Sequence, residues 1–188
     1  MTSWNPILTE QLEWLWTHQL RPRLEGLTDD EYLWEPAPSA WNVRPRDPAA
    51  VPAQPGSGEL TIDFTYPEPV PAPVTTIAWR LAHVIVGVLG ARVHGHFGGP
   101  AVDYQTFEYA GTAAGALQQL DEAYAAWLAG VRTWSDEDLA QPCGTAEGPW
   151  HAYSRATLVL HINREVIHHG AEIALLRDLW AHRSARSA

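Results

Sequence analysis

The sequence predicts an all-α protein, a four-helix bundle with a long Pro-rich first crossover. Four segments repeat apolar residues at spacings of three and four, which is the period of an amphipathic helix. Capping residues, glycine or proline stand at the ends of these segments. By contrast, residues 35–74 hold many of the 15 prolines and show no sustained period. A chain of 188 residues suits one domain, 1–188, and we expect residues 182–188 to form a disordered tail.

The first helix is predicted over residues 6–20, where leucine, isoleucine and tryptophan give a wide apolar face. Asn5 is the expected N-cap, and Pro6 suits the first helical position because its missing N–H has no partner there. Pro22 is expected to break or kink the helix, since proline cannot donate to the preceding turn. Gly26 then provides the stop.

A short helical turn over residues 28–34 is expected next, with a threonine cap. The connection over 35–74 that follows is unusually long for a compact domain, so we expect it to be functional or ordered against the core. Residues 60–66 alternate between apolar and polar side chains and predict a short strand or an extended strip. They do not by themselves predict a sheet.

The second helix is predicted from about residue 77 to 96, before the glycines at 98 and 99. The third spans about 113–134, and residues 135–138 cap another short turn. The fourth spans about 154–181. From these segments we expect four antiparallel helices around one core.

Composition excludes several classes of function. Twelve Arg and Lys against 22 Asp and Glu give a formal charge of −10, which disfavours nucleic-acid binding. The single cysteine, Cys143, excludes an intrachain disulfide and a Cys-based zinc site. We find no apolar run of the roughly 18–20 residues that cross a bilayer, and no signal-peptide pattern, so we expect a cytoplasmic protein without a membrane partner. Ten tryptophans fill a core or line a pocket, with Trp41, Trp79 and Trp150 as candidate walls.

The fourth helix carries a stripe of histidine and glutamate. At about 100° per residue one narrow stripe holds four side chains and a fifth lies at its edge: His161, Glu165, His168 and Glu172, with His169 at the edge. Residues four apart, such as Glu165 and His169, can converge on one ion. Imidazole and carboxylate together suit zinc, nickel, iron or manganese. The alternative is a solvated polar stripe, or histidines that satisfy one another in the core.

Another histidine, His83, stands among apolar residues of the second helix. A lone histidine on an apolar face is more often a satisfied core residue than a ligand. Its combination with the stripe on the fourth helix favours a metal site built from two helices.

Two runs of sequence carry these residues: Thr-Ile-Ala-Trp-Arg-Leu-Ala-His at 76–83, and His-Ile-Asn-Arg-Glu-Val-Ile-His-His-Gly-Ala-Glu-Ile at 161–173. In this order and at this separation they resemble the motifs of the DinB superfamily, the DinB/YfiT-like group of metalloenzymes. The resemblance covers most of the chain. It implies a four-helix bundle of down-up-up-down topology with a long first crossover.

The resemblance also implies a metal site formed by one histidine of the second helix and a His-x-x-x-His pair of the last. The second-helix ligand falls on His83 and the last ligand on His169. The first member of the pair falls on Glu165, a departure that keeps ligation possible and changes the charge balance of the site. His161 could replace one of these ligands, or could hydrogen-bond to a ligand without touching the metal. His168 is a candidate for the second of these roles.

Relatives in the family include thiol S-transferases that use mycothiol or bacillithiol, and a mycothiol-dependent isomerase. The resemblance therefore implies a divalent metal that binds a small-molecule thiol such as mycothiol. The metal presents this thiol as a thiolate to a small electrophile. Trp79, Arg80 and Arg164 are the candidate cofactor-binding residues. We favour a second role for the two arginines, as partners of Glu165 and Glu172.

Two other classes of function stay open. One is a non-catalytic bundle that binds a metal or a small molecule, or a homodimer whose helices serve mainly as interface. The other is a metal-dependent hydrolase, which needs a general base near the metal-bound water, with Glu172 or His168 as the candidate. His94 and His96 are expected at the surface, near the C-terminal dipole of the second helix.

Overall fold

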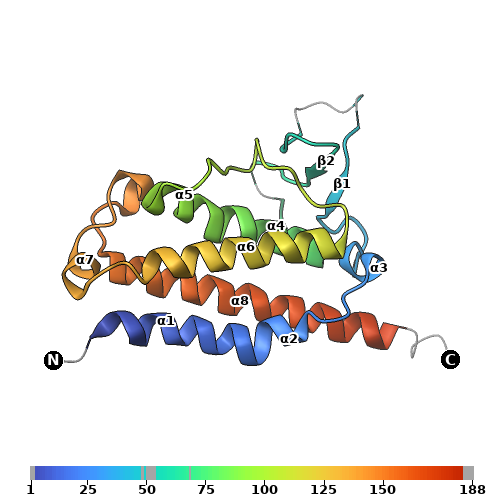
Figure 1. The fold of residues 1–188 in the computed structure, drawn as a ribbon. Coiled ribbons are helices and arrows are strands. Elements are labelled where there is room, and N and C mark those ends of the chain that lie inside the picture. Colours follow the sequence, from blue (N-terminus) through green and yellow to red (C-terminus); the bar gives the residue numbers. More distant parts are fainter. Residues whose placement is uncertain (1–2, 48, 50–53, 68, 184–188) are drawn as a thin grey trace.

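The computed structural model describes residues 3–47, 49, 54–67 and 69–183, and it confirms the predicted helical bundle (Figure 1). The first long helical segment contains α1 (Trp4–Leu15), the π-helical η1 (Trp16–Leu20) and α2 (Arg21–Arg23). The second contains α4 (Ile77–His83), the π-helical η2 (Val84–Gly90) and α5 (Ala91–Phe97). The third is α6 (Ala113–Val131) and the fourth is α8 (Arg155–His182). Of the expected tail, residue 182 belongs to α8, and residues 184–188 lie outside the described part of the chain.

The first helical segment differs from its prediction at both ends. Its N-cap is Ser3, not Asn5. The Asn5 side chain instead donates to the carbonyl oxygens of Val131 and Trp134, at 2.7 and 2.8 Å, and so ties the start of α1 to the end of α6. The helix also continues past Pro22, because the preceding π turn moves the backbone hydrogen bonds one residue along and makes room for the proline ring.

The Pro-rich crossover carries a small sheet that the sequence did not predict. Strands β1 (Val43–Pro45) and β2 (Leu60–Ile62) pair antiparallel, with Val43 opposite Ile62. A strand of three residues is too short to show a period, and only the β2 region was expected to be extended. The crossover lies at the end of the bundle that also holds α3 (Asp29–Tyr32), the predicted short turn capped by Thr28 (Figure 1).

The second helical segment follows its prediction closely. Thr76 caps it by accepting a hydrogen bond from the Trp79 N–H, and Gly98 ends it with a φ of +71°. By length and composition, residues 77–97 also match a membrane span, with a mean hydropathy of 1.2, so the estimate that no run reaches this length was wrong here. Of that window, 56% is buried inside the bundle, as in the core helix of a globular protein.

The helices are not all antiparallel. The α4–α5 segment and α6 run in the same direction, and the connection over 98–112 crosses the length of the bundle between them (Figure 1). After α6, the short α7 (Asp136–Ala140) and the 3₁₀ helix η3 (Thr145–Trp150) lead into α8, which begins where predicted and is capped by Ser154. The directions of the four helical segments, taken in chain order, give the down-up-up-down topology that the family resemblance implies.

The core lies between the four segments, with Trp127, Leu81, Leu120 and Ile162 almost completely buried. Two leucines of α8, Leu160 and Leu179, point away from the core and are 50% and 44% exposed. The core continues along α8 through Val166, Ile173 and Leu176, and His169 is buried beside it while Glu165 is only partly buried.

Candidate metal centre

The structure brings together the three ligands expected from the sequence. His83 is the last residue of α4, and Glu165 and His169 lie one turn apart on α8. One donor atom from each of the three lies within 4.8 Å of the other two. The His83 and His169 rings meet edge to face with centroids 4.7 Å apart, and His169 Nε2 lies 3.5 Å from Glu165 Oε2. Two imidazoles and one carboxylate at this separation form a candidate site for a divalent ion.

A π-helical segment begins directly after His83, and its wider turn changes which residues face the centre. Gly87, inside this segment, faces Tyr104 of the crossing loop. A Cβ at position 87 would collide with the Tyr104 hydroxyl and lie 3.3 Å from His83 Nδ1. The absence of a side chain at Gly87 therefore lets Tyr104 reach the histidine.

Both candidate imidazoles are held through Nδ1. The Tyr104 hydroxyl lies 2.6 Å from His83 Nδ1, and Glu172 Oε2 lies 2.7 Å from His169 Nδ1. Hydrogen bonds of this kind fix the ring orientation and leave Nε2 of each ring as the metal-binding nitrogen. The sequence did not identify Tyr104, because its loop has no helical period and no motif.

Arg80 completes this arrangement from α4. Its Nε lies 3.1 Å from Glu172 Oε2, so it forms the ion pair that we favoured from the sequence. Burial lowers the pKa of Arg80, and the charge of Glu172 opposes that shift. Glu172 is therefore engaged by Arg80 and by His169 and is poorly placed to act as a general base.

The environment of His83 favours its neutral form. Its pKa falls to about 4, mainly because of burial; the charges of His169 and Arg80 act in the same direction, and the charge of Glu165 opposes them. A neutral imidazole keeps the lone pair that a metal needs. Burial also raises the pKa of Tyr104 to about 12, so its hydroxyl keeps its proton near neutral pH.

The other histidines of the α8 stripe lie outside this triad. His161 Nδ1 is 3.5 Å from Glu165 Oε1, on the carboxylate oxygen that does not face His169, and it accepts a hydrogen bond from Arg164 at 2.7 Å. His168 is exposed, and its Nε2 is 3.5 Å from Glu172 Oε1. His168, His169 and Glu172 form a second cluster with donor atoms within 4.8 Å. Its members belong to one helix, and Arg80 already pairs with its carboxylate, so the triad that includes His83 is the better site.

A cavity of about 470 Å³ opens beside His83. Trp79 stacks on the His83 ring with centroids 5.6 Å apart, and Trp41 lies 5.7 Å from Trp79. The indole N–H of Trp79 donates to the carbonyl oxygen of Asp63 at 2.8 Å, which ties the crossover to α4. The further lining comes mostly from the crossover: Pro55, Ile62, Asp63, Phe64, Thr65 and Tyr66, with Tyr104 and Gln105. The Pro-rich connection thus forms most of the wall of the cavity beside His83.

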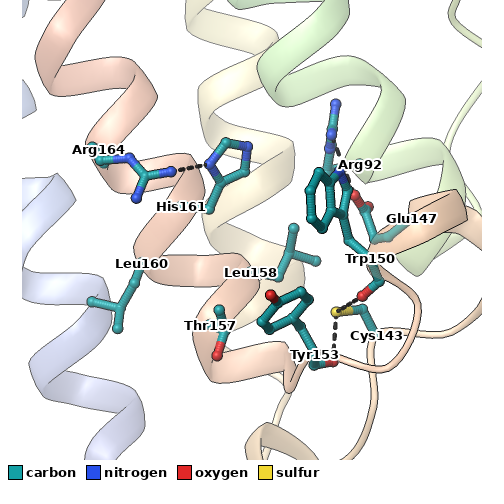
Figure 2. A pocket seen from close by; sticks show the side chains of 10 residues that line it. All are labelled: Arg92, Cys143, Glu147, Trp150, Tyr153, Thr157, Leu158, Leu160, His161 and Arg164. Carbon is teal, nitrogen blue, oxygen red and sulfur yellow. Dashed lines mark hydrogen bonds and ion pairs between the residues drawn. The ribbon is translucent and has the colours of Figure 1, made fainter.

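A second cavity, of about 530 Å³, lies near His161 and Arg164 and is lined by Trp150 (Figure 2). Arg164 was a candidate cofactor-binding residue, and the structure places it here rather than beside Trp79. His96, which bonds to the lining residue Glu147, differs from its prediction. It is not at the surface, because its side chain is 4% exposed and bonds to Glu147 Oε1 at 2.9 Å.

Comparison with known proteins identifies the family. No curated protein and no solved structure matched the chain. The family model described as the DinB superfamily matches residues 11–173. This range includes both sequence motifs, all three donors of the candidate centre, and Tyr104 and Glu172 behind them. The chain belongs to the DinB superfamily.

Proposed function

We propose that this protein is a divalent-metal-dependent thiol S-transferase that uses a thiol of the mycothiol type. The observation that carries the proposal is the triad of His83, Glu165 and His169, in which both imidazoles are oriented through Nδ1. Such a site holds zinc, nickel, iron or manganese through three protein ligands and leaves a position for a thiol. When bound, the metal lowers the pKa of that thiol.

The residues around the triad support this chemistry. Tyr104 and Glu172 fix the two imidazoles, so little reorganisation accompanies ligand exchange. Trp41, Trp79 and the crossover give the adjoining cavity apolar walls that shield a thiolate from water. With one carboxylate and two neutral imidazoles, a divalent ion keeps a net positive charge that attracts a thiolate.

A non-catalytic metal-binding bundle is the alternative that the same triad allows. The hydrolase alternative has less support. Of its two candidate bases, Glu172 is engaged by Arg80 and His169, and His168 is exposed and faces Glu172.

Metal content and thiol consumption test the proposal together. We expect near-stoichiometric metal by plasma mass spectrometry in the wild type, and loss of it in His83→Ala and Glu165→Ala. His168→Ala, an exposed histidine of the same helix, is the matched control and keeps the metal. The loaded wild type should consume a bimane electrophile only when mycothiol is present. If the protein binds metal but shows no thiol-dependent turnover, the non-catalytic metal-binding bundle is favoured. If it binds no metal even after reconstitution, both the transferase and the metal-binding bundle are overturned.

A further inference from the structure

The second cavity has an apolar body and a polar rim (Figure 2). It lies between α5, the segment around η3 and the first turns of α8. Leu158 contributes a buried surface, whereas Trp150 and Tyr153 are 60% and 53% exposed. Exposed aromatic surface that lines a cavity gains free energy when an apolar ligand covers it. A volume of about 530 Å³ is in the range of small-molecule sites.

One wall of the rim is fixed by a buried carboxylate. Arg92, from α5, donates to Glu147 Oε2 at 3.2 Å, and His96 occupies Oε1 of the same carboxylate at 2.9 Å. Glu147 is 8% exposed, and its pKa lies below its usual range, mainly because of the His96 hydrogen bond. Both oxygens of this carboxylate are therefore engaged. Among the lining residues it is the one acidic side chain, so no carboxylate of the lining is left free to repel an anionic ligand.

The opposite wall offers hydrogen-bond donors. His161 Nδ1 accepts from Arg164, so the imidazole proton lies on Nε2. Figure 2 shows this second nitrogen on the side of the ring that faces Arg92. Arg164 itself is 71% exposed and keeps further N–H groups at the mouth of the cavity.

We propose that this cavity binds a small amphipathic carboxylate. Its apolar body lies against Leu158, Trp150 and Tyr153, and its carboxylate accepts a hydrogen bond from His161 Nε2. Arg164 holds the proton of His161 on Nε2 through its contact with Nδ1, and its positive charge at the mouth of the cavity attracts the carboxylate. Hydrogen bonds to an ionised carboxylate are among the stronger polar contacts in proteins. The site goes beyond the proposed function, because neither the metal nor the thiol takes part in it.

Calorimetric titration of the metal-free protein tests this site independently of metal and thiol chemistry. The probes are 2-naphthoate and its neutral analogue 2-naphthamide. We expect naphthoate to bind about tenfold more tightly than the amide, because only the carboxylate gains charge-assisted bonds. Arg164→Gln should remove most of that preference. Arg23→Gln, a second exposed arginine that pairs with a carboxylate on α8, is the matched control and should keep it.

A further variant locates the probe. Thr157 is exposed and lines the cavity, so Thr157→Trp should fill the mouth and weaken both probes at least about tenfold without removal of core packing. Circular dichroism of each variant verifies the fold. Equal affinity for the two probes overturns the proposal, as does wild-type naphthoate affinity in Arg164→Gln or in Thr157→Trp. Absence of naphthoate binding to the folded wild type also overturns it.

Discussion

The hydroxyl of Tyr104 lies 2.6 Å from Nδ1 of His83, and this contact joins the loop that crosses the bundle to the candidate metal centre. The loop over 98–112 exists because α4–α5 and α6 run in the same direction, so the chain must return along the bundle between them (Figure 1). The topology thereby brings an outer support to a ligand that α4 alone would leave free to rotate.

Tyr104→Phe should weaken metal binding about 10- to 100-fold, the usual cost of removing a hydrogen bond behind a metal-binding histidine. The aromatic ring and its packing remain, so the fold should be unchanged. Competition with a chelator of known affinity measures the effect. Tyr153→Phe, at the second cavity, is the control. Equal affinity in Tyr104→Phe and the wild type would show that the tyrosine does not support the ligand.

Gly87→Ala should weaken metal binding to a similar extent without a change in any ligand. The added Cβ would collide with the Tyr104 hydroxyl, so the tyrosine must leave His83. Gly115→Ala on α6 is the matched control, because its Cβ meets only Ala110 and Thr112 at 3.2 Å, away from the centre. Chelator competition on both variants checks the prediction. A Gly87→Ala protein with wild-type affinity would contradict it.

The sequence predicted the start of a helix correctly where the capping residue keeps its local role in the folded protein. The helices predicted to start at about residues 77, 113 and 154 do start there, and Thr76, Thr112 and Ser154 cap them by accepting a backbone hydrogen bond. The predicted cap of the first helix was wrong, because the Asn5 side chain donates instead to the carbonyl oxygens of Val131, at the end of α6, and of Trp134 beyond it. A local rule cannot anticipate a partner about 130 residues away.

The candidate centre was also predictable only where local sequence or a family motif determines it. The spacing of Glu165 and His169 fixes their relative position on one helix, and the family motif adds His83 from another. Tyr104 and the walls of the adjoining cavity come from segments without periodicity, and their positions depend on topology and on β1–β2 pairing. His96 was misplaced for a related reason. It stands near a helix end, where exposure is common, but Glu147 of η3 packs against it and bonds to its ring.

Glu172→Gln should weaken metal binding about 10- to 100-fold, since the amide is a poorer acceptor for the Nδ1–H of His169. It should also lower the free energy of unfolding by about 1 kcal/mol, because Arg80 loses its paired charge at a partly exposed site. Chelator competition and urea unfolding measure the two effects. Glu122→Gln, an exposed glutamate of α6, is the control and should change neither. A loss of stability without a loss of affinity would restrict Glu172 to a structural role.

The metal-free protein should lose stability as the pH falls below about 6.5, and His83 should account for much of the loss. In the unfolded chain a histidine binds a proton near pH 6.5. In the folded protein His83 resists protonation until its pKa of about 4, mainly because it is buried. Between these values the unfolded state binds the additional proton, so the free energy of unfolding decreases with falling pH. The pKa of His161 is also lowered, chiefly by burial, and adds to the loss in the same direction.

The contribution of His83 is isolated by comparison with His83→Gln, which keeps a polar group of similar size and cannot titrate. Urea unfolding of both metal-free proteins from pH 7.5 to 4 should give curves that diverge below pH 6.5. The wild type should lose up to about 3 kcal/mol more than the variant by pH 4. Glu147 and the other carboxylates titrate in both proteins and cancel in the difference. Parallel curves over this range would mean that His83 is not held neutral by its surroundings, and the argument for it as a ready metal ligand would lose its electrostatic basis.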